Sequence, residues 1–315
     1  MRGRKAEFER KLAQTGLRQL PDLLQALPDE TARLARLCYA ASPAGDWLDT
    51  PPEVFFSCAA HARYLRENVS WTRALPEPLF LAYVLHPRVN NEALCDCRPV
   101  FYAALAERLR GLPEEAAVLE INRWCAEHVA YQPTDERTRS ALAVLRAGFG
   151  RCGEESMFAV NVLRACGFAA RQVYVPRWAH CDDNHAWVEV RCGGAWHFLG
   201  ACEPEAVLDR GWFNSAAGRA VLVHSRCFGE PEPGADLIGR EGDVVYCNET
   251  ARYADVRRLT VRVTDENGMS AAGADVDFCI LNNCEWYPAA TVQTDASGMA
   301  ALTCGLGSLR LLARR

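Results

Sequence analysis

The sequence predicts an α+β protein, with a helical first part and strands that follow one another in the second part. Leucines recur at mixed three- and four-residue spacing early in the chain, which is typical of amphipathic helices. Further along, a helix that begins at Cys152 is followed by short β-rich runs joined by a Gly-Gly turn. A helix followed by a meander of antiparallel strands is an α+β layout.

Composition narrows the functional classes. A chain of 315 residues suggests about two domains. With 50% hydrophobic and 24% charged residues, it has ordinary globular composition. The formal net charge of −5 gives no basic excess to neutralise phosphates, so we expect no nucleic-acid partner.

Cysteine usage and the first residues bear on the compartment. The 15 cysteines are scattered from Cys38 to Cys304 and form no regularly spaced framework. The first residues, MRGRKAEFERKLAQTG, lack the apolar run of a secretory signal. Uninterrupted apolar stretches of about 18 residues, which a membrane span needs, are absent from the sequence. We therefore expect a cytoplasmic protein with mostly reduced thiols and no membrane partner.

Residues 1–110 are predicted to form a helical N-terminal region that packs on the core. Amphipathic helices are expected over 100–109 and 114–129, because apolar residues recur on one face of each. Glutamates lead the second helix, where they favour a helix N-terminus, and we expect such Glu-rich first turns to be solvated faces.

Residues 111–228 are predicted to form the core. Its central helix starts at Cys152, and Gly167 suits the C-terminal end of that helix. Three β-rich runs are expected to form strands: 170–175, 185–191 and 195–199.

The rest of the chain divides into two parts. Residues 229–256 are rich in Gly, Pro and Glu and are predicted to be a linker. Residues 257–315 alternate apolar and polar side chains between turn signals, which predicts a small β-sandwich domain. The expected strands are few for a closed sandwich, so this domain is either minimal or truncated.

Cys152, in the sequence GRCGEES, is the first candidate for chemistry. The positive end of a helix dipole lowers the pKa of a thiol, and the neighbouring glycines let a substrate approach. A buried, unreactive cysteine is the alternative. His185 opens the strand HAWVEV and could face the thiol, although a structural histidine is also possible.

Four sequence blocks resemble the transglutaminase-like superfamily: GRCGEES, ARQVYVPRWAH, DDNHAWVEV and GAWHFLG. The resemblance covers about residues 115–215 and implies a papain-like Cys–His–Asp arrangement, with the Cys on a helix and the other two residues on adjacent strands. It implies that Cys152 is the nucleophile and His185 the general base. Residues 259–312 are similar to prealbumin-like or carboxypeptidase-regulatory-like β-domains, which bind carbohydrate or protein or act as spacers.

The third catalytic position departs from the family pattern. The family usually has Asp-Pro four residues after a tryptophan, but Gly200 stands at that distance from Trp196. The nearest acidic residue before a proline is Glu203. We expect a loop bulge to present Glu203 to His185, which needs an orienting group. Two aspartates remain alternatives: Asp183 and Asp209.

The expected function is that of a thiol-dependent hydrolase or acyltransferase acting on a peptide, protein or glycopeptide substrate through a thioester. No cofactor or metal is expected, because the cluster His180, Cys181, Asp183 and His185 lacks the usual spacing of zinc ligands. The tryptophans Trp178, Trp187 and Trp212 either line the cleft or belong to the core. Two alternatives stay open: a catalytically silent scaffold that binds protein or glycan, and an amidase acting on glycopeptides.

Overall fold

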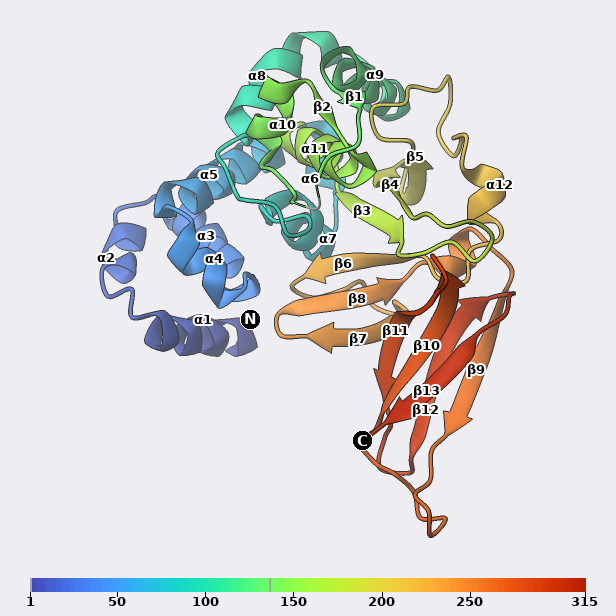
Figure 1. Ribbon diagram of the computed structural model, residues 1–315. Helices are drawn as coiled ribbons and strands as arrows, with labels where there is room; N and C mark the ends of the chain where they lie inside the picture. The colour runs from blue at the N-terminus through green and yellow to red at the C-terminus, as the bar shows by residue number, and fades with distance from the viewer. Residues whose placement is uncertain (1, 136) are drawn as a thin grey trace.

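Helices make up the first part of the computed structural model, which describes residues 2–135 and 137–315 (Figure 1). The helices before the first strand are α1 Arg2–Thr15, α2 Leu20–Gln25, α3 Asp29–Ala41, α4 Ala44–Asp49, α5 Pro52–Asn68, α6 Ser70–Ala74, α7 Glu77–Phe80, the π-helical turn η1 Leu81–Leu85, α8 Arg98–Leu109 and α9 Glu114–His128. Helices α8 and α9 confirm the two predicted amphipathic helices. Across the described residues, no helix has both the length and the apolar character that a membrane crossing needs.

A six-stranded antiparallel sheet forms the centre of the molecule, with strand order β5-β4-β3-β6-β8-β7. Its strands are β3 Ala170–Val175, β4 His185–Cys192, β5 Ala195–Leu199, β6 His224–Phe228, β7 Leu237–Glu241 and β8 Val244–Asn248. Strands β3, β4 and β5 confirm the three predicted runs. Gly193 and Gly194 both have positive φ, as the tight turn between β4 and β5 requires.

The predicted linker over 229–256 is wrong, because this segment supplies strands β7 and β8 of the central sheet. Val245 and Cys247 of β8 point into the core and are each about 1% exposed. Most of the glycine, proline and glutamate residues that predicted a linker lie outside the strands, although Gly239 and Glu241 belong to β7. Gly242, at φ 55°, forms the turn between β7 and β8. Composition therefore concealed a short hairpin that tertiary packing stabilises.

The N-terminal helices and the sheet share one apolar cluster. Leu34, Phe55 and Tyr83 from the helices belong to the same buried cluster as Cys227 and Val245 from the sheet. Lys11 of α1 is fully buried and pairs with Asp243 of the β7–β8 turn at 2.7 Å. The helical region thus packs directly on the sheet, and a buried ion pair fixes α1 to its edge.

The central helix α11, Cys152–Ala165, lies between these helices and the sheet, and its residues are buried from Glu154 onward. Its N-terminus is capped by the Glu154 carboxylate, which accepts the Arg151 backbone N–H at 3.4 Å. Gly167, at φ 90°, ends the helix in the left-handed conformation, as predicted. Small elements beside α11 are β1 Ala130–Tyr131, α10 Ala141–Ala147 and β2 Phe149–Gly150. Two further short helices are α12 Asn214–Ala217 and η2 Thr250–Arg252.

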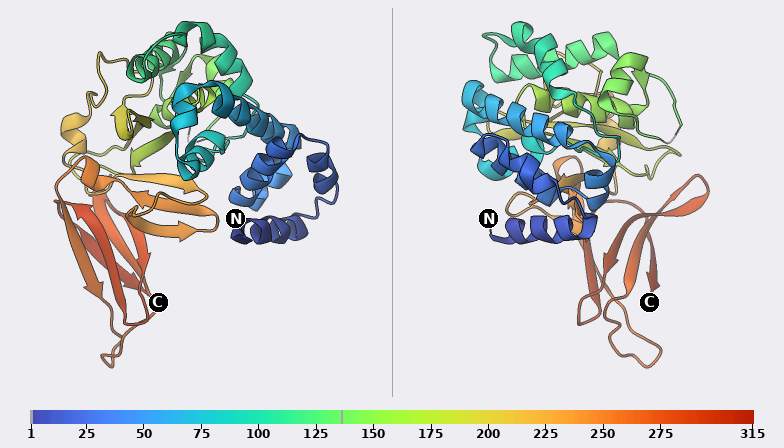
Figure 2. Two further views of the ribbon diagram at one scale, coloured as in Figure 1. Left: turned by 180° about the vertical axis from the view of Figure 1, so that it is seen from behind. Right: turned by 90° about the vertical axis from the view of Figure 1, so that its left-hand side faces the viewer.

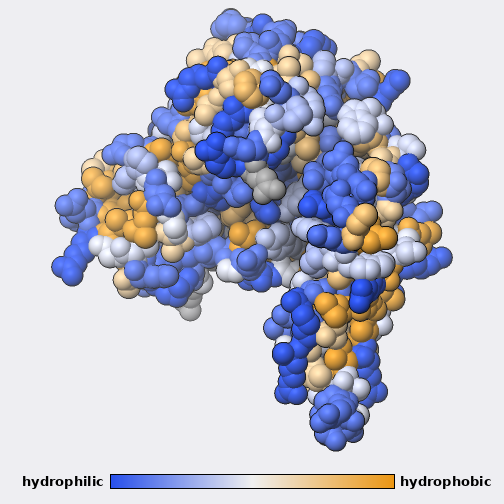
Figure 3. All heavy atoms as spheres, viewed as in Figure 1, coloured by the Kyte–Doolittle hydropathy of each residue, from blue (hydrophilic) through white to orange (hydrophobic). Residues whose placement is uncertain are grey.

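The C-terminal β-domain projects from the sheet (Figure 2). Its strands are β9 Val256–Arg262, β10 Asp275–Asn282, β11 Glu285–Gln293, β12 Met299–Gly305 and β13 Arg310–Arg314. Strand β9 pairs with β12, and the other three form a second sheet in the order β11-β10-β13. Phe278 and Leu302 meet in the apolar core between the two sheets. Apolar side chains also gather on the outside of this domain (Figure 3).

Candidate active site

Cys152 is the first residue of α11, and its position depends on β3 and β4. The side chain of Gln172 on β3 donates hydrogen bonds to the Gly153 carbonyl at 2.9 Å and to the Ser156 hydroxyl at 2.7 Å. The Cys152 thiol itself accepts backbone N–H groups of Ala186 and Gly153. Ala186 follows His185 in the sequence, so the thiol is held beside the backbone that carries the histidine.

The prediction of a lowered Cys152 pKa is wrong. Burial raises the pKa of the thiol, and this effect exceeds the lowering by the two N–H groups and by the nearby charge of Arg151. The helix start therefore supplies hydrogen bonds to sulfur without making the resting thiol a thiolate, because desolvation disfavours the charged form.

A cavity of about 350 Å³, called here the active-site cavity, contains both Cys152 and His185. The start of α11, the end of β3 and the start of β4 form most of its walls. Tyr287 of β11 closes one side and carries the Arg177 guanidinium over its ring at 4.4 Å. The β-domain therefore contributes directly to this cavity.

His185 begins β4 opposite Val175 of β3 and is 8% exposed. Its ring packs against aromatic neighbours, with centroid distances of 4.8 Å to Trp212 and 5.0 Å to Phe213. This burial lowers the pKa of His185 to about 4, although the charge of Asp183 acts in the opposite direction. The Nε2 atom is buried and has no hydrogen-bond partner among the described residues.

Among the described residues, Glu203 is connected to His185 only through Trp212, whose ring packs on the imidazole. Both carboxylate oxygens accept the Trp212 indole N–H at 3.0 Å, and no hydrogen bond joins Glu203 to His185 in the described part of the chain. Val188 of β4 pairs with Leu199 of β5, so the next residues along the two chains, Trp187 and Gly200, lie opposite each other. Because side chains alternate between the two faces of a sheet, this position is on the same face as His185. A Cβ on residue 200 would overlap Oε2 of Glu203. The Glu203 carboxylate thus occupies the place of the side chain that Gly200 lacks.

The two alternative aspartates are placed differently. The Asp209 carboxylate binds Nδ1 of His197 at 2.6 Å and the Phe198 N–H at 2.9 Å, so it is held against β5. Asp183 accepts the Asn184 N–H at 2.7 Å and reaches His185 only through its charge. Glu203 differs from both aspartates because it accepts a hydrogen bond from the Trp212 indole, and that indole packs on the His185 ring.

Glu155, one helical turn after Cys152, is a buried acid that the sequence prediction missed. The expectation of a solvated first turn is wrong here, because Glu155 is 4% exposed and Glu154 is fully buried. Burial, and then the charge of Glu203, raises the pKa of Glu155 to about 8. The three-residue spacing from Cys152 was the available signal, since it places both side chains on one helix face.

The tryptophans have separate roles. Trp178 and Trp187 belong to a buried cluster, whereas Trp212 is 66% exposed and covers His185. Within the described residues, no group of three or more His, Cys, Asp or Glu side chains is arranged to hold a metal ion.

The loop that leads to His185 is fixed by the β-domain. The Asn282 side-chain amide, at the end of β10, donates to the carbonyl oxygens of Trp178 at 2.9 Å and Cys181 at 2.8 Å. The Asn283 N–H binds the Asp182 carboxylate at 2.7 Å. The β10–β11 turn therefore holds residues 178–183 in place, directly before the histidine.

The fold and this site define an α+β protein of papain-like architecture, with a cysteine at the start of a buried helix and a histidine at the start of a neighbouring strand. More particularly, residues 103–201 match the sequence model of the transglutaminase-like superfamily, so the chain contains a transglutaminase-like domain.

A solved structure of a candidate cysteine protease from Cytophaga hutchinsonii aligns over 59% of this chain and 68% of its own, with 14% identity and a TM-score of 0.34. A search of curated proteins found no significant match.

Proposed function

We propose that the protein is a cysteine-dependent hydrolase or acyltransferase that acts on peptide or amide bonds. Cys152 is the nucleophile, His185 the general base and Glu203 the acid that orients His185. The observation that carries this proposal is the active-site cavity, which is lined by both Cys152 and His185. The thiol also lies at a helix start, where backbone N–H groups can stabilise negative charge.

The reaction starts from a neutral thiol and a neutral imidazole, because burial shifts both pKa values in that direction. His185 takes the thiol proton as sulfur attacks the amide carbonyl carbon, and the Cys152 N–H stabilises the oxyanion. The C–N bond then breaks, the imidazolium gives its proton to the leaving amine, and a thioester remains. Water or an amine attacks the thioester with His185 again as base, which restores the thiol.

Glu203 acts when His185 becomes positively charged. The buried Nε2 atom then needs an acceptor, and the Glu203 carboxylate, which lies over Gly200 and bonds the indole of Trp212, is the acceptor in this proposal. In this proposal the carboxylate exchanges its bond with Trp212 for one with His185. Such an orienting acid stabilises the imidazolium and selects the productive tautomer.

The test is a screen of amide, peptide and glycopeptide substrates with matched variants. Cys152→Ala should remove the activity, whereas Cys181→Ala, which changes an exposed thiol, should retain it. Glu203→Gln should lower kcat by roughly 10²- to 10⁴-fold, and the neighbouring Glu205→Gln should have little effect. Full amide-cleaving activity in Cys152→Ala would overturn the proposal.

A catalytically silent scaffold is the second candidate function, and the bond between Glu203 and Trp212 favours it. In that case His185 keeps an unpaired Nε2 and the cavity serves binding alone. An electrophilic peptide probe distinguishes the two, since a silent scaffold would label at Cys152 no faster than at the exposed Cys284.

A further inference from the structure

A second cavity of about 650 Å³ continues from the active-site cavity between the central sheet and the β-domain. The two cavities share three lining residues: Tyr174, Pro176 and Tyr287. A molecule that occupies the second cavity can therefore extend to Cys152 without leaving the protein surface. The strands that bound it, β7 and β11, are edge strands of their sheets, as far as the described residues show.

Four side chains from three strands form the floor of the second cavity. Tyr174 on β3 pairs with His224 on β6, and Arg226 pairs with Tyr246 on β8. Their rings are in contact, with centroid distances of 4.0 Å from His224 to Tyr174 and 5.7 Å to Tyr246. These residues therefore share one face of the sheet and line the cavity, and each carries polar side-chain atoms.

Two of these polar atoms lack partners. The His224 Nδ1 and Arg226 Nε atoms are buried and have no hydrogen-bond partner within the described chain. His224 is only 6% exposed, so it is an unpartnered polar side chain that is more than nine-tenths buried. Buried polar atoms without partners are uncommon in native proteins, and a missing ligand is one explanation.

Arg226 supplies positive charge in this cavity. Its guanidinium lies over the rings of Tyr174 at 5.3 Å and Tyr246 at 5.7 Å and also hydrogen-bonds the side chains of these two tyrosines. Glu241 and Asp275 also line the cavity, but Glu241 accepts the Tyr246 hydroxyl and Asp275 accepts Gln293. Burial and the charge of Arg226 lower the pKa of His224 to about 3, so this histidine is neutral.

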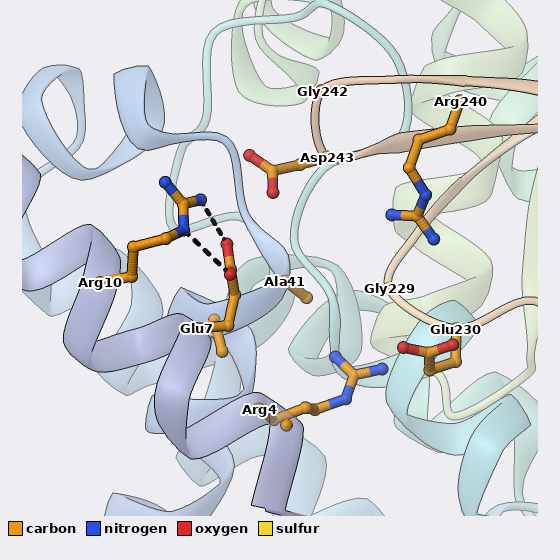
Figure 4. Close-up of a pocket in the computed structure, with 11 residues that line it drawn as sticks. Arg4, Glu7, Arg10, Ala41, Gly229, Glu230, Arg240, Gly242 and Asp243 are labelled. Carbon is orange, nitrogen blue, oxygen red and sulfur yellow. Dashed lines mark hydrogen bonds and ion pairs between the residues drawn. The ribbon is translucent and has the colours of Figure 1, made fainter.

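A third cavity, of about 710 Å³, is a weaker candidate for a ligand site. It lies between α1 and the β7–β8 turn and does not include Cys152. Figure 4 shows its charged side chains, of which Arg10 is paired with Glu7. Asp243 is likewise paired with the buried Lys11.

We propose that the second cavity is a substrate subsite in which Arg226 and His224 bind a carboxylate of an extended peptide whose reacting amide lies at Cys152. The subsite presupposes the amide chemistry proposed above and adds a substrate class to it, peptides with an acidic group at a fixed distance. A guanidinium is the side chain best suited to bind a carboxylate. Edge strand β11 offers backbone groups with which an extended peptide can pair.

The distance between the two sites follows from the strand pairing. Ala186, Tyr174 and His224 lie opposite one another on three adjacent strands. Three adjacent strands span about 10 Å, and an extended peptide advances about 3.3 Å per residue. The bound carboxylate should therefore lie about three or four residues from the scissile amide. A C-terminal carboxylate and an Asp or Glu side chain share this chemistry.

The test measures peptide binding to full-length Cys152→Ala protein by titration calorimetry. The probes are N-acetylated, C-amidated octapeptides of Ala and Gly with one Glu at each position in turn, and the same peptides with Gln. An all-Ala octapeptide with a free C-terminus distinguishes the second source of a carboxylate. We expect one Glu position, or the free C-terminus, to bind roughly 10- to 100-fold more tightly than its neutral counterpart.

Arg226→Gln, introduced into the Cys152→Ala protein, should abolish the preference for the carboxylate peptide. Arg258→Gln, at an exposed position on β9, should leave this preference unchanged. Thermal melts check folding, and Arg226→Lys, which keeps the charge, should retain part of the preference. Equal binding of Glu and Gln peptides, or no binding of either, would overturn the subsite even if Cys152 proves catalytic. If carboxylate binding depends on Arg226 but Cys152 proves unreactive, the carboxylate-binding site is supported and only the proposed enzymatic activity is overturned.

Discussion

At the residue scale, the site is defined by what burial does to its ionisable groups. The Cys152 thiol and the His185 imidazole are both neutral at pH 7, because desolvation raises the pKa of the thiol and lowers the pKa of His185 to about 4. In the proposed mechanism, proton transfer between them therefore accompanies substrate attack. A thiolate–imidazolium pair in the resting protein is not the arrangement that these pKa values favour.

The pH dependence of reactivity follows from these values. A base with a pKa near 4 is neutral above that pH, so kcat/KM should be retained down to about pH 5 and fall below pH 4. Iodoacetamide labelling of Cys152, read by mass spectrometry, should rise at a pH above the ordinary thiol value of about 8.5. Cys284 serves as an exposed reference thiol. A labelling midpoint well below 8.5, or an acidic limb near pH 6.5, would contradict this description.

Glu155 gives a second prediction, which concerns stability. Its pKa is about 8 in the folded protein and about 4.5 when unfolded, so the folded state holds a proton between these values that the unfolded state releases. Its contribution to stability is therefore lost as pH rises from 4.5 to 8. Glu155→Gln should be within about 1 kcal/mol of the wild type at pH 5 and exceed it by roughly 5 kcal/mol at pH 9 in urea unfolding. The exposed Glu115→Gln should change stability at neither pH.

At the element scale, α11 determines the site because both of its ends are fixed by neighbours. Its first turn is fixed by Gln172, and its last turn ends at Gly167, where Thr72 donates a hydrogen bond to the Gly167 carbonyl at 2.8 Å. A Cβ on residue 167 would overlap the Thr72 hydroxyl. The helix therefore ends at this residue for both a conformational and a packing reason.

Gly167→Ala should destabilise the protein by more than the usual cost of placing alanine at a positive φ, because the added Cβ also overlaps Thr72. Gly111, at φ 76°, provides the control, because nothing described lies within 4 Å of a Cβ placed there. We expect Gly111→Ala to cost about 1 kcal/mol and Gly167→Ala roughly 2 to 4 kcal/mol, measured by urea unfolding. Equal costs would mean that Thr72 moves aside freely and does not fix the end of α11.

Elements with strong local signals were predictable from sequence. The helices α8 and α9 and the strands β3, β4 and β5 have regular apolar patterns, and Gly193-Gly194 marks the turn between two of the strands. The β7–β8 hairpin was missed because both strands are short and lie in a segment rich in Gly, Pro and Glu. Pairing with β6 and burial of Val245, rather than local sequence, make this segment a hairpin.

At the scale of the whole molecule, the β-domain takes part in the site. Its Tyr287 lines the active-site cavity, and its Asn282 is 2% exposed and bonds the loop before His185. A domain that served only as a spacer would not need a buried amide at this junction. The two parts are expected to depend on each other for a correctly placed histidine.

Asn282→Ala tests this dependence. The change leaves the carbonyl groups of Trp178 and Cys181 without their donor, so residues 178–183 should loosen. We expect faster proteolytic cleavage in this loop and a decrease of roughly 10-fold or more in kcat, with the fold retained by circular dichroism. Asn267→Ala, at an exposed turn elsewhere in the β-domain, should behave as wild type. Unchanged cleavage and kcat in Asn282→Ala would show that the clamp is dispensable.

The sequence by itself determined the α+β class, the helix that begins at Cys152, the strand that begins at His185 and the resemblance to the transglutaminase-like superfamily. These follow from local periodicity, turn residues and short motifs, which depend on neighbours in the chain. Only the tertiary structure decided where the Glu203 carboxylate lies, that Glu155 is buried, and that Arg226 and Tyr287 adjoin the cavity. Burial, strand order and pKa shifts depend on segments far apart in the sequence, and no local pattern encodes them.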